Sequence, residues 1–238
     1  MISPLRKPAP RSASPAHRRG SLDQVLINAA MDLFASYGYR GTSLARIARA
    51  AGVTKGALYW HFTDKEDFFL AVVNKVLGDW HAHVLKIPKT ASAAVFRSEY
   101  LQIFEKNAEF NEKNPWVTRL LMIITLESHK IGPRVLRAMR RANLAQFEQL
   151  SRLIESGKAV GAFDQSLDVQ WAASQMWTTT SGLAMLWYLH GPRFDLRRAL
   201  RRQADEFLKD WSKPGIGGAP GKSAKLEHTK PDRAKSIQ

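Results

Sequence analysis

The segment from Thr42 to Lys65 constrains the fold more than any other part of the chain. Apolar residues recur there at helical spacing on both sides of a short turn segment, and these are Leu44, Ile47, Ala48, Leu58 and Phe62. Gly52 lies in the turn segment, where it can adopt the positive φ that a tight turn requires. The spacing therefore predicts two short helices, joined by a tight turn, whose apolar sides face inward.

The outer side of this predicted hairpin is basic and aromatic. The first helix carries Arg46 and Arg49 on that side, the second carries lysine and aromatic residues, and no Asp or Glu occurs between Arg40 and Thr63. Gly56 destabilises the second helix by about 1 kcal/mol relative to alanine. A glycine at such a position is explained if the helix backbone approaches a partner closely. This pattern is typical of a helix-turn-helix whose second helix enters the major groove of DNA. The alternative is a small helical hairpin whose basic residues are only solvated, but outward-facing aromatics favour a partner surface.

The net charge of +15 lies mainly in the two ends of the chain. Residues 1–20 contribute +5 and residues 213–238 contribute +4, whereas residues 21–70 have no net charge. Both ends are rich in Pro, Gly or Ser, so we expect a disordered basic arm at 1–20 and a disordered basic tail at 213–238. Such tails add salt-dependent affinity for DNA and little sequence specificity. The helix-turn-helix interpretation therefore rests on where its cations are placed.

Everything between the tails is expected to be α-helical, because no stretch shows sustained period-2 alternation. The segment Val169–Pro192 lacks charged residues, but its Gln, Ser and Thr content favours a helix buried on both faces over a membrane span. Nine helices are predicted. The first four run from Ser21 to just before Gly38, from Thr42 or Ser43, from near Thr54, and from Asp64 to about Ile87. The other five cover about 91–112, Asn114 to about His129, Pro133 to Ser156 with Gly157 just beyond its end, the uncharged segment from Val169 up to the Gly191-Pro192 break, and Asp195 to about Trp211.

Residues distributed over about 21–80 resemble the signature of TetR-family transcriptional repressors. They are Phe34, Gly38, Thr42, Ile47-Ala48, Ala51-Gly52-Val53, Gly56, Leu58-Tyr59, His61-Phe62 and Lys65. The Tyr59–Phe62 run is similar to that of AcrR-type multidrug-efflux regulators. The resemblance implies an all-α homodimer with an N-terminal three-helix DNA-binding domain at 21–80, its helix-turn-helix at about 43–62, and a ligand-binding and dimerisation domain at 81–212. The last two helices of each subunit would form a four-helix bundle.

The resemblance also implies roles for individual residues at a double-stranded operator. Positions matching Thr42, Ser43, Tyr59, His61 and Lys65 usually touch phosphates, and those matching Lys55, Gly56, Ala57 and Trp60 lie near base edges. Arg46 completes the predicted DNA-binding set. Lys55 is the first candidate for a direct contact to guanine O6 and N7.

Inducer pockets of this family lie among the helices that follow the DNA-binding domain. Candidate ligand contacts are Phe104, Trp116, Leu120, Ile123, Ile124, Glu127, Phe147, Trp177 and Thr180, although each is also a plausible core residue or, for Glu127, an ion-pair partner. Their aromatic and aliphatic character suggests a small, bulky hydrophobic inducer. The sequence thus indicates a ligand-responsive, sequence-specific repressor that acts in the cytoplasm at the nucleoid. The alternative is an architectural or non-specific DNA-binding protein driven by its basic tails.

Other chemistries find little support. The chain has no cysteine, which excludes disulfides and thiolate zinc sites. His81 and His83 are two residues apart, so on a helix they point in different directions and do not form the i, i+4 pair of a metal site. No nucleophile–base arrangement, phosphate loop or carboxylate pair is recognisable, so we expect no enzyme activity, no cofactor and no metal.

Overall fold

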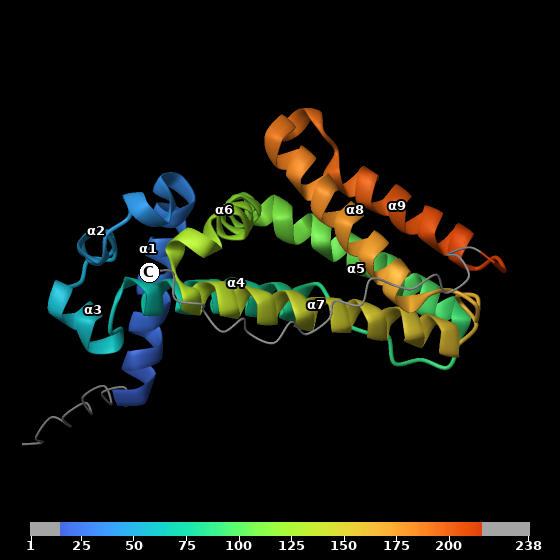
Figure 1. The fold of residues 1–238 in the computed structure, drawn as a ribbon, viewed down its shortest axis with the longest axis horizontal. Helices are drawn as coiled ribbons and strands as arrows, with labels where there is room; N and C mark the ends of the chain where they lie inside the picture. Colours follow the sequence, from blue (N-terminus) through green and yellow to red (C-terminus); the bar gives the residue numbers. More distant parts are fainter. Residues whose placement is uncertain (1–14, 216–238) are drawn as a thin grey trace, which may run out of the picture. The chain divides into compact units, whose positions relative to one another are not determined.

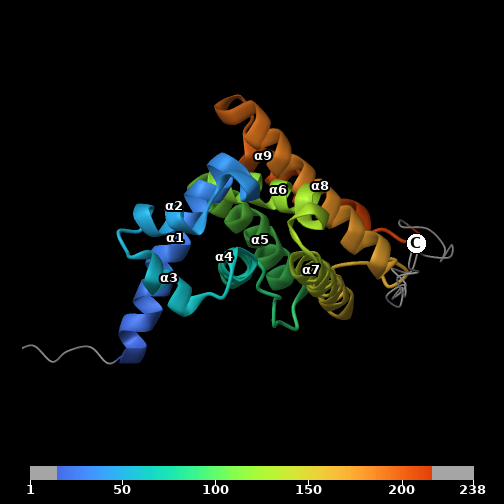
Figure 2. The same cartoon turned by 60° about the vertical axis from the view of Figure 1, so that its left-hand side comes forward.

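The computed structural model describes residues 15–215, which form α-helices and one short 3₁₀ helix and contain no strand. The all-helical prediction is therefore confirmed for this part of the chain. Most of both predicted basic tails lies outside the described residues. Figures 1 and 2 show the helices. The described chain divides into two compact units, of which the first contains the residues up to 79 and 114–140, and the second contains 80–113 and the residues from 141 onward.

The first unit contains the N-terminal helices and one helical pair from the middle of the chain. α6 packs along α1, where Nη2 of Arg119 donates a hydrogen bond to the carbonyl oxygen of Ser36 at 3.2 Å. The core is built from fully buried side chains, including Leu26, Phe34, Ile47, Leu58, Phe68, Phe69 and Leu120. The helices are α1 (Pro15–Gly41), α2 (Leu44–Ala50), α3 (Lys55–His61), the part of α4 (Lys65–His83) up to Asp79, α6 (Pro115–Ile131) and the part of α7 (Pro133–Ala159) up to Arg140.

The sequence predicts the end of the regular part of α1 correctly but places its beginning too late in the chain. The helix begins at Pro15 and not at Ser21, and a proline fits the first turn of a helix because it has no N–H to leave unpaired. Its regular part ends where predicted, because Gly38 has φ 67° and ψ 178° and interrupts the helix. The chain therefore changes direction at Gly38, directly before α2.

The second unit is held together by an aromatic core. It contains the end of α4, most of α7, α5 (Ala93–Lys113), α8 (Val169–His190), the 3₁₀ helix η1 (Gly191–Arg193) and α9 (Leu196–Trp211). α5 packs against α9, and Arg197 on α9 forms an ion pair with Glu112 on α5 at 2.6 Å. Rings of Phe96, Tyr100, Phe163 and Trp211 pack against one another in the interior, with centroid distances between 5.5 and 6.0 Å along that chain of contacts.

The predicted end of α7 is wrong, because Gly157 lies inside the helix. α7 continues to Ala159, and the chain turns at Gly161, which has φ 71°. A Cβ added to Gly157 would lie 2.3 Å from Cδ2 of Phe163 and 2.8 Å from Cζ of Phe96. The glycine is therefore there to let two aromatic rings approach the helix backbone, which a helix-end rule cannot detect.

α8 corresponds to the long uncharged segment of the sequence. Ala172, Ala173 and Met176 are buried, but four large apolar side chains of the same helix are exposed in the single chain: Trp171, Met185, Leu186 and Leu189. Within the single chain the helix is thus buried on one face only, and burial of its other face would need a partner. Among the described residues, no helix combines the length and the hydropathy that a bilayer span requires.

Candidate nucleic-acid interface

The turn between α2 and α3 is defined by local hydrogen bonds that the sequence encodes. Ser43 caps α2, since its Oγ accepts a hydrogen bond from the backbone N–H of Arg46 at 3.2 Å. Thr54 caps α3 in the same way, with Oγ1 accepting from the N–H of Ala57 at 3.1 Å. Between the two helices Gly52 has φ 68°, as predicted. Each cap satisfies one backbone donor that the first turn of a helix leaves unpaired.

Burial fixes which side of each helix faces outward. Leu44, Ile47 and Ala48 are buried on α2, and Leu58 is buried on α3. Phe62 is half-buried at the end of α3, where its ring packs edge-on against Phe68 at 4.7 Å. Four of the five residues that the apolar spacing assigned to the interior are therefore buried, and the fifth, Phe62, is half-buried. The opposite side of both helices is consequently directed away from the core.

The outward side of α3 presents a lysine, a glycine and two large aromatics. Lys55 and Gly56 are exposed, and 48% of Tyr59 and 70% of Trp60 are accessible. A Cβ added to Gly56 would find no atom closer than Thr54 Oγ1 at 4.0 Å. Within the described residues, no neighbouring atom therefore requires a glycine at this position, and the backbone of α3 is open to solvent there.

Thr42 has a different environment from the other predicted phosphate contacts. Its side chain is 1% exposed, and Oγ1 donates to the carbonyl oxygens of Leu33 at 3.1 Å and Gly38 at 2.9 Å. The hydroxyl thus ties the start of α2 to the end of α1. In this structure Thr42 orients the helix-turn-helix from the inside.

Of the remaining predicted contacts, Ser43 and Arg46 are exposed at the start of α2, and the other three lie in the first turn of α3, at its end and at the start of α4. Ala57, His61 and Lys65 are half-buried. The Nζ atom of Lys65 lies 4.2 Å from the centroid of the Tyr39 ring, and burial lowers the pKa of this lysine. Burial also raises the pKa of the Tyr39 hydroxyl, with Glu66 and Asp64 adding to the effect.

A network of charged residues holds the connection between α3 and α4. Asp64 caps α4, since its Oδ1 accepts from the N–H of Asp67 at 2.8 Å. Arg134 on α7 donates through Nη2 to Asp64 at 2.7 Å and through Nε to Glu66 at 2.9 Å. The hydrogen bond from Asp67 and that from Arg134 lower the pKa of the Asp64 carboxyl.

Glu66 in turn caps the first turn of α7. Its Oε1 accepts from the backbone N–H groups of Arg134 at 3.0 Å and Val135 at 3.2 Å. A Cβ on Gly132 would lie 2.5 Å from that same oxygen, so the glycine makes room for the carboxylate. Sequence reasoning missed this network, because it identified Gly132-Pro133 only as a helix break and the contacts join residues about seventy positions apart in the chain.

The candidate ligand residues are divided between the two units. Phe104 is buried in the core of the second unit, where Phe147 and Trp177 pack against that core. Thr180 is also in the second unit, and its Oγ1 donates to the carbonyl oxygen of Met176 at 2.7 Å. The other candidates are on α6 in the first unit, with Leu120 and Ile124 fully buried and the rest half-buried: Trp116, Ile123 and Glu127.

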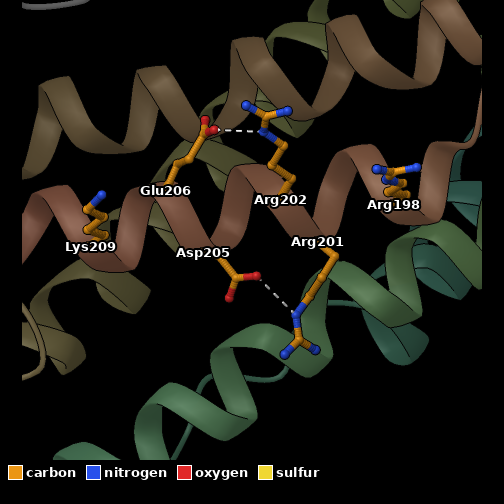
Figure 3. Close-up of a pocket in the computed structure, with 6 residues that line it drawn as sticks. All are labelled: Arg198, Arg201, Arg202, Asp205, Glu206 and Lys209. Carbon is orange, nitrogen blue, oxygen red and sulfur yellow. Dashed lines mark hydrogen bonds and ion pairs between the residues drawn. The ribbon is translucent and has the colours of Figure 1, made fainter.

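A shallow depression of about 340 Å³ lies on the outer side of α9 (Figure 3). Its lining consists only of charged residues: Arg198, Arg201, Arg202, Asp205, Glu206 and Lys209. Ion pairs join Arg202 to Glu206 at 3.0 Å and Arg201 to Asp205 at 3.5 Å across this surface. None of the predicted ligand residues lies there, and a lining of paired charges does not suit a hydrophobic compound.

The part of the chain that contains α2 and α3 matches a known protein family. The family model described as bacterial regulatory proteins, tetR family, matches residues 26–72. The HTH-type transcriptional regulator AcrR of Shigella flexneri is 29% identical over 186 residues, which cover 75% of this chain and 83% of AcrR.

Solved structures show the same fold. SmeT, the repressor of the Stenotrophomonas maltophilia multidrug efflux pump SmeDEF, superposes with a TM-score of 0.65 at 20% identity, covering 84% of this chain and 94% of SmeT. FadR from Bacillus subtilis, solved in complex with stearoyl-CoA, superposes with a TM-score of 0.64 at 21% identity, covering 78% of this chain and 96% of FadR.

Proposed function

This chain belongs to the TetR family of transcriptional regulators and is of the AcrR type, and on that premise we propose that α3 reads a palindromic operator in the major groove of DNA. The observation that carries the proposal is the outward side of α3. Lys55, Tyr59 and Trp60 extend from a helix that Leu58 anchors, and Gly56 leaves its backbone open to a close approach. DNA bound in this way is released when a small hydrophobic ligand binds elsewhere in the protein.

We assign the DNA contacts to two classes. Lys55 binds guanine O6 and N7, and Gly56, Ala57 and Trp60 lie along the base edges next to it. Phosphates are bound on either side by exposed or half-buried groups, namely Ser43, Arg46, Tyr59, His61 and Lys65. Thr42 supports these contacts through its hydrogen bonds to α1 and does not touch DNA with its side chain.

The architectural alternative is not favoured. In that alternative the basic tails drive binding to any DNA, and the cations of residues 21–70, which equal the acids in number, need no particular placement. The cations Arg40, Arg46, Arg49 and Lys55 instead follow one another without an intervening acid, whereas Asp64 and Glu66 are hydrogen-bonded to Arg134. Placement of this kind suits sequence-specific recognition, with the tails adding affinity for any DNA.

Replacing Lys55 with alanine should relax specificity at one position of each operator half-site. The loss of a direct lysine–guanine contact removes about 1–3 kcal/mol of discrimination against the wrong base pair. Fluorescence anisotropy with the operator and all its single-base-pair variants measures this directly. Lys89→Ala is the matched control, since it removes an exposed lysine on the loop between α4 and α5. An equal loss of affinity for every sequence, random DNA included, would identify Lys55 as a phosphate contact and contradict its assigned role.

We propose that the protein acts as a homodimer through α8 and α9. Exposed Trp171, Met185, Leu186 and Leu189 give α8 an apolar face that a single subunit leaves uncovered. Burying such a face against a second copy is the expected way to remove it from water. A two-fold dimer would set two recognition helices about 34–36 Å apart, one helical turn of DNA. Because a repressor acts where its operator DNA lies, we assign the protein to the cytoplasm at the nucleoid.

The proposed ligand is a small, predominantly apolar molecule. Its support is the aromatic and aliphatic character of the candidate residues in both units, with Phe104, Phe147 and Trp177 in one and Trp116 and Ile123 in the other. A hydrophobic compound that raises the Tm of the protein should also lower its operator affinity by at least about tenfold, since release requires preferential binding to the DNA-free state. Titration of the preformed operator complex checks this. A compound that binds tightly but leaves the complex intact would contradict ligand-induced release.

A further inference from the structure

An exposed tyrosine outside the helix-turn-helix covers one of its arginines. The guanidinium carbon of Arg46 lies 3.6 Å from the centroid of the Tyr37 ring. Tyr37 belongs to the last turn of α1 before the break at Gly38, and 51% of it is exposed. In the described part of the chain, no carboxylate lies within ion-pair distance of Arg46. The tyrosine ring is therefore the partner that the structure gives to this guanidinium.

Both members of this stack are attached to well-defined backbone. Thr42 fixes the connection between α1 and α2 by its two buried hydrogen bonds, and Ser43 holds the backbone of Arg46 by capping α2. A Cβ on Gly41 would lie 3.2 Å from Cβ of Tyr37, so the tyrosine packs closely on the connecting backbone. The ring thus lies beside the first turn of α2, over the side chain of Arg46.

Stacking leaves the donors of the guanidinium available. The tyrosine covers one flat face, whereas the N–H groups of an arginine point outward in the plane of the guanidinium. That planar fork is the geometry in which arginine binds phosphate oxygens in pairs. A stacked arginine at the edge of a DNA-binding surface is therefore preorganised for the DNA backbone.

Two neighbouring lysines also lie over tyrosine rings, but one of these tyrosines packs in the core and the other is a predicted phosphate contact. Tyr39, below Lys65, packs against Phe34 and Phe69 in the core of the first unit. Tyr59 lies 5.6 Å from Nζ of Lys55, one helical turn away on α3 itself, and is a predicted phosphate contact. Tyr37 contributes half its surface to solvent and is not part of the predicted DNA-binding set, so its contact with Arg46 requires a separate explanation.

We propose that Tyr37 is a positioning residue of the DNA interface, which orients the guanidinium of Arg46 toward a phosphate beside the groove that α3 enters. This inference rests on the proposed DNA-binding function. With this contact the DNA interface extends to the end of α1, and Arg46 binds the DNA backbone. Because a phosphate contact does not read the bases, the sequence preference of the protein should not depend on Tyr37.

The test compares Tyr37→Ala, Tyr37→Phe, Arg46→Ala and the Tyr37→Ala/Arg46→Ala double variant in the full-length protein. Affinity for operator DNA and for random duplex DNA is measured over a salt series. Tyr37→Ala should weaken binding about two- to fivefold at each salt concentration, as expected for an exposed cation–π contact, with the salt slope unchanged because the charge of Arg46 remains. Tyr37→Phe should restore the affinity, because the ring is retained.

Arg46→Ala should lower the salt slope by about one, and the double variant should bind no more weakly than Arg46→Ala alone. If Tyr37→Ala weakened binding by the same factor with and without Arg46, the two residues would act independently and the proposal would be overturned. Wild-type affinity for Tyr37→Ala would overturn it as well. If the protein did not recognise an operator sequence, the proposed function would fail, but a phosphate contact of Arg46 would still show the same effects of all four variants on random DNA. The two failures are therefore distinguishable.

Discussion

Replacing Leu58 with alanine is expected to destabilise the first unit by about 2–5 kcal/mol and to abolish operator binding at concentrations that saturate the wild type. Leu58 is the buried residue of α3 and is inaccessible to solvent. α3 has seven residues, too few to remain helical without the packing that this side chain provides. The outward residues of α3 would then lose the fixed arrangement that the major groove requires.

Denaturant titration and operator anisotropy on the same preparations measure both effects. Leu58→Met is the matched control, because a swap of similar volume in a core costs less than about 1.5 kcal/mol and should preserve binding. A Leu58→Ala protein with normal stability and normal operator affinity would show that α3 is not positioned by this contact.

Replacing Gly157 with alanine should cost the second unit about 1–3 kcal/mol or more. The new methyl group would overlap the rings of Phe163 and Phe96, which are buried at 2% and 0% exposure in the core of the second unit. Gly78→Ala provides the control, since that glycine is also inside a helix and its added Cβ would meet no atom within 4 Å. There the same substitution should stabilise the protein by about 0.5–1 kcal/mol.

The opposite signs of these two changes make thermal unfolding a sufficient measurement. The Gly157→Ala substitution should lower Tm, and the Gly78→Ala substitution should raise it. Equal shifts at both positions would mean that Gly157 is an ordinary helix glycine and that the aromatic packing around it is not as described.

The helix-turn-helix could be predicted in detail because its signals are local. Ser43 and Thr54 precede the helices they cap, and Gly52 lies within the turn that needs its positive φ. The caps of later helices follow the same rule, with Asp195 accepting from the N–H of Arg198 at 2.9 Å. In each case the residue and its partner are separated by only a few positions, so the sequence alone contains the relevant geometry.

Features that depend on distant parts of the chain escaped prediction. A glycine at position 157 is typical of the residue just after a helix end. Its place inside α7 is explained by the close approach of the Phe96 and Phe163 rings, which come from distant parts of the fold. The hydrogen bonds of Arg134 to Asp64 and Glu66 likewise join segments that no local pattern connects. The ligand candidates share a hydrophobic character that core residues also have, so their role remains a proposal.

Selection of binding sites from a random duplex pool shows whether α3 recognises a particular DNA sequence. We expect the full-length protein to enrich a two-fold symmetric sequence whose half-sites are about 10–10.5 base pairs apart, or a multiple of that spacing. At physiological salt this sequence should bind at least about 10³-fold more tightly than a base-shuffled duplex. Enrichment of no common sequence, with equal affinity for the selected and shuffled duplexes, would contradict this recognition.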